Sequence, residues 1–398
     1  MSSRRVVVAG AGLAGLRVAE TLRRLGWEDE IVLVGEEDVP PYDRPPLSKD
    51  VLLGLRDPES VALRPRERLG ELDLDLRLGV RATGLDSARR ELATDAGPVG
   101  YDELVIATGS VARSLPLFDG LENAMTLRTL DEAIRLRDDL VHAGHVVVVG
   151  AGFIGSEIAS AARERGIDVT VLELDPVPLQ RVLGAELGNG FAALHRENGT
   201  DLRLGVTVER VERDGARAGR LHLTDGTAIE PDLVVVGVGA VPATAWLEGS
   251  GLELGNGVVC DDRLRASAPG VSAIGDVCSW PNALFGGRRM RVEHWTNASE
   301  QAGHVARGLI GEDTGPFRGS NFVWSDQYGV RIQFVGVASP DVAAVDGTIG
   351  SAPFLAWYRE DGRVVGALAV DAPKLLLRSR KAIEAGATWE DALASLQD

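Results

Sequence analysis

Two glycine-rich segments of the chain carry residue types whose spacing could do chemistry. The first reads "VVVAGAGLAG" and the second "VVVVGAGFIG", and each runs from an apolar stretch into a helical pattern. The glycines have the same spacing in both segments: Gly10, Gly12 and Gly15 in the first, and Gly150, Gly152 and Gly155 in the second. Such a turn lets the backbone approach a pyrophosphate, and the following helix offers free N–H groups at its amino end. Two copies therefore predict two dinucleotide sites.

An acidic residue follows each glycine turn at the distance that a dinucleotide site requires. Glu36 stands 21 residues after Gly15, and Glu173 stands 18 residues after Gly155. At the end of the second strand of the unit, a carboxylate accepts hydrogen bonds from a ribose diol. Because a carboxylate repels a 2′-phosphate, Glu173 favours NADH over NADPH, although Arg181 could soften this preference.

The elements that must position these residues form an internal repeat of strand, helix and strand. Apolar strands at residues 6–9 and 31–34 flank the first helical pattern, and the second segment repeats this order. Similar apolar stretches at residues 101–110 and 231–242 bracket the second segment. They indicate two crossings between one dinucleotide domain and another that is inserted into it. The predicted fold class is α/β, with two Rossmann-like domains.

The last part of the chain, residues 317–398, has a different pattern. Apolar residues alternate in "FVWSDQYGVRIQFVGV", and Asp361 and Gly362 join two further alternating stretches. Asp-Gly between such stretches is a strong hairpin signal. We therefore predict a small α+β domain with an antiparallel sheet and terminal helices.

Two further motifs could contribute to a ligand site. The stretch "PPYDRPPLSKD" presents Arg44 and Lys49 on a proline-stiffened loop between a strand and a helix. In "GVSAIGDVCSW" a short apolar strand ends in Gly275 and Asp276. Alone, Gly-Asp after a strand is more often a turn, but its place after the second glycine segment favours a functional role for Asp276.

Composition excludes several classes of function. The 398 residues carry a net charge of −17, which argues against nonspecific nucleic-acid binding and against docking on anionic lipid. No apolar run reaches membrane-spanning length and the opening lacks a signal-peptide pattern, so we expect a cytoplasmic protein without a membrane partner. Cys260 and Cys278 form no Cys-x-x-Cys pair and the histidines are scattered, so we expect no metal site and no dithiol redox centre.

Over essentially its whole length the sequence resembles the oxygenase-coupled NADH:ferredoxin reductases, the family of putidaredoxin, rubredoxin and biphenyl-dioxygenase ferredoxin reductases. The motifs that carry the resemblance are "PYDRPPLSK", "TLRTLDEA", "GAGFIGSEIA", "AIGDV", "VEHWTNASEQA" and "WSDQYG". The resemblance implies an FAD enzyme that takes electrons from NADH and passes them singly to a [2Fe–2S] ferredoxin. This ferredoxin would supply a haem monooxygenase or a ring-hydroxylating dioxygenase.

The resemblance also implies a domain order and residue roles. Residues 1–112 and 239–316 would form the FAD domain, residues 113–238 the NAD domain, and residues 317–398 a C-terminal domain. Lys49 would lie at the flavin and pair with Glu157, both as catalytic residues. The FAD site would include Gly10, Gly12, Ala14, Gly15, Glu36, Arg44, Lys49, Ala82, Arg128, Asp276 and Trp295. The NAD site would include Gly150, Gly152, Phe153, Ile154, Gly155, Glu157, Glu173 and Gly239.

Thiol-dependent relatives on the same scaffold need an early redox cysteine, where this chain has Leu47, Ser48 and Lys49, so the sequence argues against that chemistry. Two rival functions stay open: a direct one-electron reductase of a small molecule, and a redox-sensing flavoprotein of the apoptosis-inducing-factor type. Trp324 is expected near the flavin, and the C-terminal domain either shapes the acceptor site or supports the core or a dimer. Two basic clusters are candidates for a docking patch or solvated faces: Arg288, Arg289 and Arg291, and Arg378, Arg380 and Lys381.

Overall fold

The structure is a computed structural model that describes residues 4–348 and 351–397. The chain divides into two units, each built from interleaved segments. The first unit comprises Met1–Asp43, Ala62–Val111 and Val241–Asn321, and the second comprises Arg44–Val61, Ala112–Ala240 and Phe322–Asp398. In the described part of the chain, no helix has the length and apolar character needed to cross a membrane.

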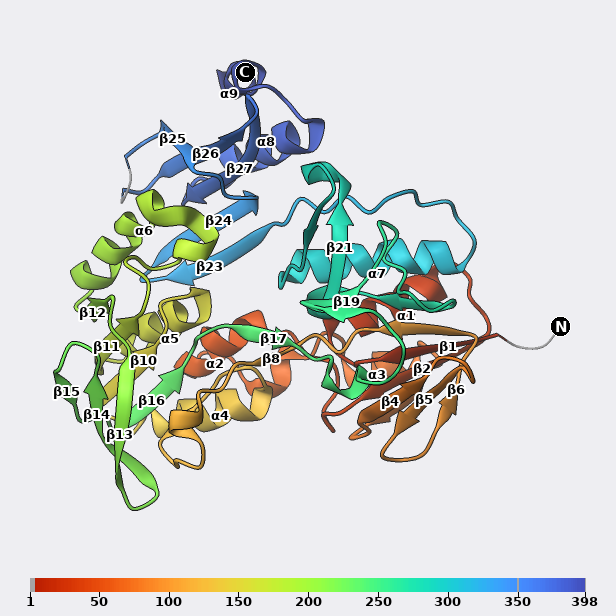
Figure 1. Ribbon diagram of the computed structural model, residues 1–398, viewed down its shortest axis with the longest axis horizontal. Coiled ribbons are helices and arrows are strands. Elements are labelled where there is room, and N and C mark those ends of the chain that lie inside the picture. The colour runs from red at the N-terminus through yellow and green to blue at the C-terminus, as the bar shows by residue number, and fades with distance from the viewer. Residues whose placement is uncertain (1–3, 349–350, 398) are drawn as a thin grey trace. The chain divides into compact units, whose positions relative to one another are not determined.

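The first unit contains a five-stranded parallel sheet (Figure 1). Its strand order is β20 (Val271–Ala273), β7 (Glu103–Ile106), β1 (Arg5–Ala9), β2 (Glu30–Gly35) and β3 (Asp75–Leu78). Val6, Val7 and Val8 are fully buried, as expected for a parallel strand that is covered on both faces. Helices α1 (Leu13–Arg24) and α7 (Trp295–Leu309) contribute apolar residues to the same core. Burial of each such side chain stabilises the fold by about 1.5–3 kcal/mol.

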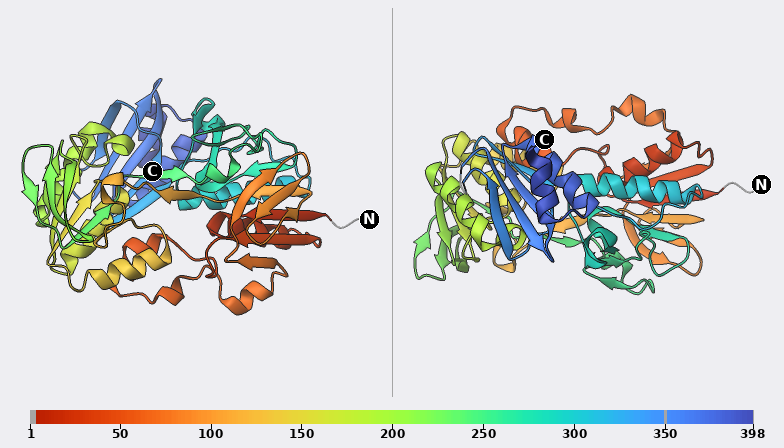
Figure 2. Two further views of the ribbon diagram at one scale, coloured as in Figure 1. Left: turned by 60° about the horizontal axis from the view of Figure 1, so that its bottom comes forward. Right: turned by 90° about the horizontal axis from the view of Figure 1, so that it is seen from above.

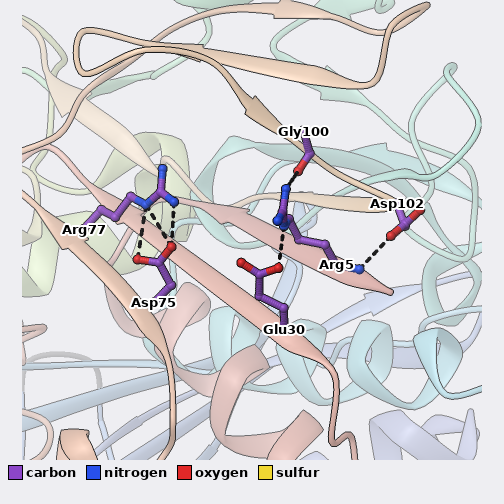
Figure 3. A network of polar contacts seen from close by, with 6 residues as sticks. All are labelled: Arg5, Glu30, Asp75, Arg77, Gly100 and Asp102. Carbon is purple, nitrogen blue, oxygen red and sulfur yellow. Dashed lines mark hydrogen bonds and ion pairs between the residues drawn. The ribbon is translucent and has the colours of Figure 1, made fainter. Parts of the chain in front are cut away.

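Polar contacts fasten this sheet at the amino end of its first strand (Figure 3). The Arg5 backbone N–H donates to Asp102, and the Arg5 guanidinium pairs with Glu30 on β2 at 2.7 Å. The same guanidinium donates to the Gly100 carbonyl. These contacts lie at the end of β1 opposite the glycine turn, so the carboxyl end of the strand is left for a ligand.

Two small sheets and a short helix complete the first unit. One sheet joins β4 (Ala82–Asp86), β5 (Glu91–Thr94) and β6 (Val99–Gly100), and the other joins β18 (Leu254–Gly255), β19 (Gly257–Val259), β21 (Cys278–Asn282) and β22 (Arg288–Met290). The short helix is α3 (Arg66–Gly70).

The second unit repeats the parallel sheet. The strand order is β12 (Asp201–Leu204), β11 (Asp168–Glu173), β10 (His145–Val149), β16 (Leu233–Val236) and β9 (Ala124–Met125). Its helices are α2 (Asp50–Leu53), α4 (Leu130–Asp139), α5 (Phe153–Glu164) and α6 (Gln180–Glu197). A three-stranded antiparallel sheet joins β13 (Val208–Asp214), β14 (Arg217–Leu223) and β15 (Ala228–Ile229). The predicted internal repeat is confirmed, because β10, α5 and β11 reproduce β1, α1 and β2.

The two predicted crossings are each broken into two strands. Residues 101–110 contain β7 and the start of β8 (Ser110–Ala112), and residues 231–242 contain β16 and β17 (Ala240–Pro242). The breaks coincide with Gly109 at φ 71° and Gly239 at φ 100°, a backbone region that strands do not adopt. Strands β8 and β17 pair with each other.

The C-terminal part of the second unit is the predicted antiparallel sheet with terminal helices. Its strand order is β23 (Val323–Gln327), β24 (Val330–Gly336), β27 (Arg363–Val370), β26 (Phe354–Glu360) and β25 (Asp341–Asp346), followed by α8 (Pro373–Ala385) and α9 (Trp389–Gln397). Asp361 and Gly362 have φ values of 50° and 73°, which confirms the predicted tight hairpin. Both views of Figure 2 show this sheet, in blue, beside the yellow-green α6. Phe334 and Tyr358 of the sheet share a core cluster with Leu187 of α6.

Candidate functional site

The glycine turn of the first unit has the shape that a phosphate-binding turn needs. Gly10 has φ 118°, and a Cβ atom there would lie 2.2 Å from the Ala107 carbonyl oxygen. At Gly15 a Cβ atom would lie 2.0 Å from the Gly10 oxygen, so helix and strand approach closely. At Gly12, by contrast, a Cβ atom would meet no protein atom within 4 Å. The turn is therefore closely packed at its first and third glycines and open at its second.

Two residues predicted for the FAD site lie near each other in the first unit. Glu36 directly follows β2, and Ala82 is the first residue of β4. Arg81, which precedes Ala82, pairs with Glu36 at 3.6 Å. This pair is exposed to solvent, so it contributes little to stability, but it places a guanidinium beside the predicted ribose carboxylate.

The Gly-Asp motif reaches the first helix. A Cβ atom at Gly275 would lie 3.3 Å from the Ala14 Cβ, so the motif packs against the start of α1. The Asp276 carboxylate accepts a hydrogen bond from Ser110 Oγ at 3.0 Å. Gln301 on α7 is fully buried, and its Oε1 accepts from the Gly275 N–H at 2.7 Å. Ala14 and Asp276, both predicted FAD contacts, are thereby close in space.

Trp295, a predicted FAD contact, is the first residue of α7. Its indole N–H donates to Asp43 at 2.8 Å, which ties the helix start to the end of the first chain segment. The preceding residue, His294, is half-buried, and desolvation of its imidazole lowers its pKa to about 4. His294 is therefore neutral at pH 7 and adds no charge at the start of α7.

The glycine turn of the second unit has the same geometry as the first. Gly150 has φ 104°, and a Cβ atom there would lie 2.5 Å from the Gly237 oxygen. Gly155 is as close to the Gly150 oxygen, at 2.1 Å, while a Cβ atom at Gly152 would meet nothing within 4 Å. Helix α5 begins directly after Gly152, so its amino end faces the open side of the turn. The other predicted NAD contacts lie at the helix start, Phe153 and Ile154, and after β16, Gly239.

Glu173 has a second role that the sequence did not indicate. Its Oε2 accepts from the Ala151 N–H at 2.7 Å, inside the glycine turn, and its Oε1 accepts from the Asp175 N–H at 2.8 Å. The carboxylate thus holds the turn as well as standing at the predicted ribose position. Arg181 pairs with Asp175 at 3.5 Å, so a carboxylate already engages the cation expected to soften the NADH preference.

The predicted ion pair between Lys49 and Glu157 is present in the second unit. Lys49 Nζ lies 2.7 Å from Glu157 Oε1, and the two side chains are 17% and 3% exposed. Lys49 also donates to the Pro45 carbonyl in the proline-rich loop. A buried pair of this kind is neutral as a whole, and loss of either partner would leave a costly isolated charge.

Two other predicted residues contact each other in the second unit. The Arg44 guanidinium donates to the Arg128 carbonyl at 2.5 Å. The Arg128 N–H donates to Glu132, which also completes a capping box with Thr129 at the start of α4. Trp324, on β23, stacks on Phe322 with ring centroids 6.0 Å apart.

Comparison with known proteins identifies the scaffold. A family model described as pyridine nucleotide-disulphide oxidoreductase matches residues 4–302, and a model described as reductase C-terminal matches residues 322–397. The chain belongs to the pyridine nucleotide-disulphide oxidoreductase family. Members of this family use FAD with NAD(H), and this chain is a flavoprotein oxidoreductase.

Individual relatives within the family are named as reductases. The chain is 36% identical to rhodocoxin reductase of Rhodococcus erythropolis, over 94% of this chain and 88% of the relative. It is 35% identical to the benzene 1,2-dioxygenase system ferredoxin–NAD(+) reductase subunit of Pseudomonas putida, over 96% and 92% of the two chains. The covalent putidaredoxin reductase–putidaredoxin complex matches with a TM-score of 0.92 at 32% identity, over 96% and 93%.

The residues present fit the two dinucleotides that this oxidoreductase scaffold uses. Gly12 and Gly152 leave open space at the position where a phosphate approaches the backbone. In the first unit, the buried atoms Gln301 Nε2 and His294 Nδ1 have no hydrogen-bond partner among the described residues. Buried polar atoms are normally satisfied, so a bound polar ligand would complete this part of the first unit.

The basic clusters are largely engaged within the reductase itself. Arg289 donates to the Cys260 and Ser279 carbonyls, and Arg291 pairs with Glu293 at 2.5 Å. Farther along the chain, Arg380 pairs with Glu384 on α8 and Arg378 donates to the Leu396 carbonyl. These contacts engage Arg289, Arg291, Arg378 and Arg380 within the chain, and the Arg291 side chain is only 10% exposed, so the docking patch stays a prediction.

Sequence reasoning missed the residues that surround Glu157. Ser48 and Ser325 each donate to its carboxylate at 2.5 Å. Ser48 precedes the predicted Lys49 and Ser325 lies in the "WSDQYG" motif, so both stood beside residues already singled out. No local pattern connects them to Glu157, because they are 109 and 168 residues away in the sequence.

Proposed function

We propose that this protein is an FAD-dependent NADH:ferredoxin reductase that passes electrons from NADH, one at a time, to a [2Fe–2S] ferredoxin. We further propose that this ferredoxin serves a haem monooxygenase or a ring-hydroxylating dioxygenase. The names of the rhodocoxin, putidaredoxin and benzene dioxygenase reductases support the first statement, and the last of these names also supports a dioxygenase system. The predicted NADH donor and the free thiols support a cytoplasmic location.

The observation that carries the proposal is the buried Lys49–Glu157 pair at the start of α5. Bound FAD supplies the conversion of a two-electron hydride into two single electrons. Lys49 and Glu157 neutralise each other, so neither adds a net charge at the site. Their fixed geometry positions the donor for transfer, which requires reacting atoms held at near-attack distance.

The position of the thiols supports electron transfer without disulfide chemistry. Cys260 and Cys278 are free and buried. Burial, with a contribution from the neighbouring Cys260, raises the pKa of the Cys278 thiol well above its usual value. A protonated, enclosed thiol is a poor nucleophile, and Leu47, Ser48 and Lys49 carry no sulfur in the early loop.

We propose ligand roles for the residues of each unit. In the first unit the FAD contacts are Gly10, Gly12, Ala14, Gly15, Glu36, Ala82, Asp276 and Trp295, and in the second Arg44, Lys49 and Arg128. The NAD contacts are Gly150, Gly152, Phe153, Ile154, Gly155, Glu157, Glu173 and Gly239. The open faces at Gly12 and Gly152 and the position of both acids after their strands support this assignment.

The test is NADH-driven reduction of cytochrome c by the yellow holoenzyme, with and without a [2Fe–2S] ferredoxin from the same organism. We expect a saturable dependence of the rate on ferredoxin. A Lys49→Ala variant that retains FAD should reduce its flavin more slowly with NADH. A rate independent of ferredoxin, with slow reoxidation of the reduced flavin, would contradict the proposal and favour the sensor or small-molecule alternative.

A further inference from the structure

Glu157 is a buried anion that accepts hydrogen bonds from other groups besides its lysine partner. Its side chain is 3% exposed, and Lys49 Nζ and Ser325 Oγ both contact Oε1, at 2.7 and 2.5 Å. Ser48 Oγ donates to the other oxygen, Oε2, also at 2.5 Å. A buried carboxylate requires such compensation, because hydrogen bonds to a charged group are stronger than neutral ones. Both carboxylate oxygens of Glu157 are therefore held by groups of the protein.

The two hydroxyls come from parts of the chain that are far apart in sequence. Ser48 ends the short 3₁₀ turn Pro45–Ser48 in the proline-rich loop, directly before Lys49. Ser325 lies on β23 of the C-terminal sheet and is fully buried. Gln327 Nε2 donates to Ser325 Oγ at 3.0 Å. Because that contact uses the hydroxyl oxygen as acceptor, the Ser325 proton is directed to Glu157.

The hairpin that carries Ser325 is fixed on α5 at a second point. Tyr328, at the turn between β23 and β24, donates its backbone N–H to Ser160 Oγ at 2.7 Å. Its hydroxyl contacts His195 Nδ1 at 2.7 Å, and His195 Nε2 contacts Ser156 Oγ at 3.1 Å. The hairpin is thus anchored through Ser156 and Ser160, on both sides of Glu157 along the helix.

We propose that Ser325 and Ser48 are positioning residues for the Lys49–Glu157 pair, and that Ser325 makes the C-terminal sheet part of the NADH-oxidising site. This inference rests on the proposed role of the pair in hydride transfer. The two serines add no charge. They fix the rotation of the carboxylate, so that Oε1 keeps the lysine ammonium at one place.

The experiment compares Ser325→Ala and Ser48→Ala with Ser379→Ala as the matched control. Ser379 is also a fully buried serine of the second unit, with bonds to Trp357 Nε1 and the Leu375 carbonyl rather than to the ion pair. Ser325→Thr retains the hydroxyl and serves as the rescue variant. The first measurement is the rate of anaerobic flavin bleaching by NADH in the holoenzyme. The second is the acylation rate of Lys49 by acetic anhydride, read by peptide mass spectrometry.

The chain is well suited to the labelling measurement, because Lys49, Lys374 and Lys381 are its only lysines. The two lysines of α8 give an internal reference for reagent concentration. Loss of one hydrogen bond to the carboxylate should release Lys49 more often, so we expect its relative acylation to rise about tenfold. This readout does not depend on ferredoxin or on turnover.

We expect Ser325→Ala and Ser48→Ala to slow flavin bleaching about tenfold, with Ser325→Thr and Ser379→Ala near the wild-type rate. Raised Lys49 acylation with unchanged bleaching would sustain the positioning role but contradict the catalytic role of the pair. Unchanged acylation and bleaching in both alanine variants would overturn the inference. A Ser379→Ala protein as slow as Ser325→Ala would also overturn it, since the effect would then reflect general loosening.

Discussion

The buried His195 predicts a specific loss of stability in mild acid. The side chain is fully buried, and desolvation lowers its pKa to about 4, with a smaller contribution from Arg196. Its contact with Tyr328, whose own pKa burial raises to about 12, keeps both groups neutral near pH 7. In the unfolded chain the imidazole would titrate near its ordinary value of about 6.5. Between about pH 6.5 and 4, the unfolded state therefore gains a proton that the folded state does not bind.

The sign and size of this loss of stability follow from the linkage between protonation of His195 and folding. The contribution of neutral His195 is complete above about pH 6.5 and declines as the pH falls toward 4, because the unfolded state binds the extra proton. At pH 5.0 a shift from about 6.5 to about 4 corresponds to roughly 2 kcal/mol of lost stability. Replacement by glutamine, which does not titrate, should remove this term from the pH dependence.

The assay is urea unfolding of wild type and His195→Gln at pH 7.5 and 5.0. The difference in unfolding free energy between the two pH values should be about 2 kcal/mol smaller in the variant. The exposed His142, replaced in the same way, should leave the difference unchanged. Deuterium exchange at the imidazole carbon, followed by mass spectrometry across pH, measures the His195 titration directly. Half-titration near pH 6.5 in the folded protein would refute the reasoning.

Two further predictions concern the dinucleotide turns. Gly12→Ala should leave thermal unfolding of the apoprotein nearly unchanged but lower the FAD content of the purified protein. Gly15→Ala should instead destabilise the fold by several kcal/mol, because its Cβ would lie 2.0 Å from the Gly10 oxygen. Equal losses of stability in the two variants would be inconsistent with an open face at Gly12. Glu173→Arg should raise the ratio of kcat/KM for NADPH to that for NADH by about tenfold or more, and an unchanged ratio would argue against the ribose assignment. Because Glu173 also accepts from the Ala151 N–H, this variant should lose some affinity for both nucleotides.

The dinucleotide turns could be predicted from sequence because their requirements are local. Gly10 must have positive φ and Gly15 must let the helix approach the strand, and both conditions act within a few residues. The hairpin at Asp361 and Gly362 was predictable for the same reason. Each of these features depends on the backbone conformation of one short segment, and the residue types in that segment indicate this conformation directly.

Contacts between segments that are far apart in the sequence could be predicted only in part. The Lys49–Glu157 pair was predicted through family resemblance, since no local spacing joins residues 108 positions apart. The bond from Glu173 to Ala151 N–H was missed, because a ribose-binding acid and a turn-holding acid occupy the same position. The breaks in the crossings were missed because Gly109 and Gly239 sit inside apolar stretches that otherwise read as single strands. The division into three domains, with the FAD domain in two segments, stays a prediction.

The role of the C-terminal sheet depends on a contact that neither sequence alternative included. The sequence left this domain either shaping an acceptor site or supporting the core, and the packing of Phe334 and Tyr358 with α6 agrees with support. Yet a purely supporting sheet would not need a buried hydroxyl directed at a carboxylate. Ser325 donates to Glu157, and Gln327 fixes the direction of that bond. The sheet therefore satisfies one of the buried charges on which the proposed hydride transfer depends, and changes in the hairpin should alter NADH oxidation before they alter electron delivery.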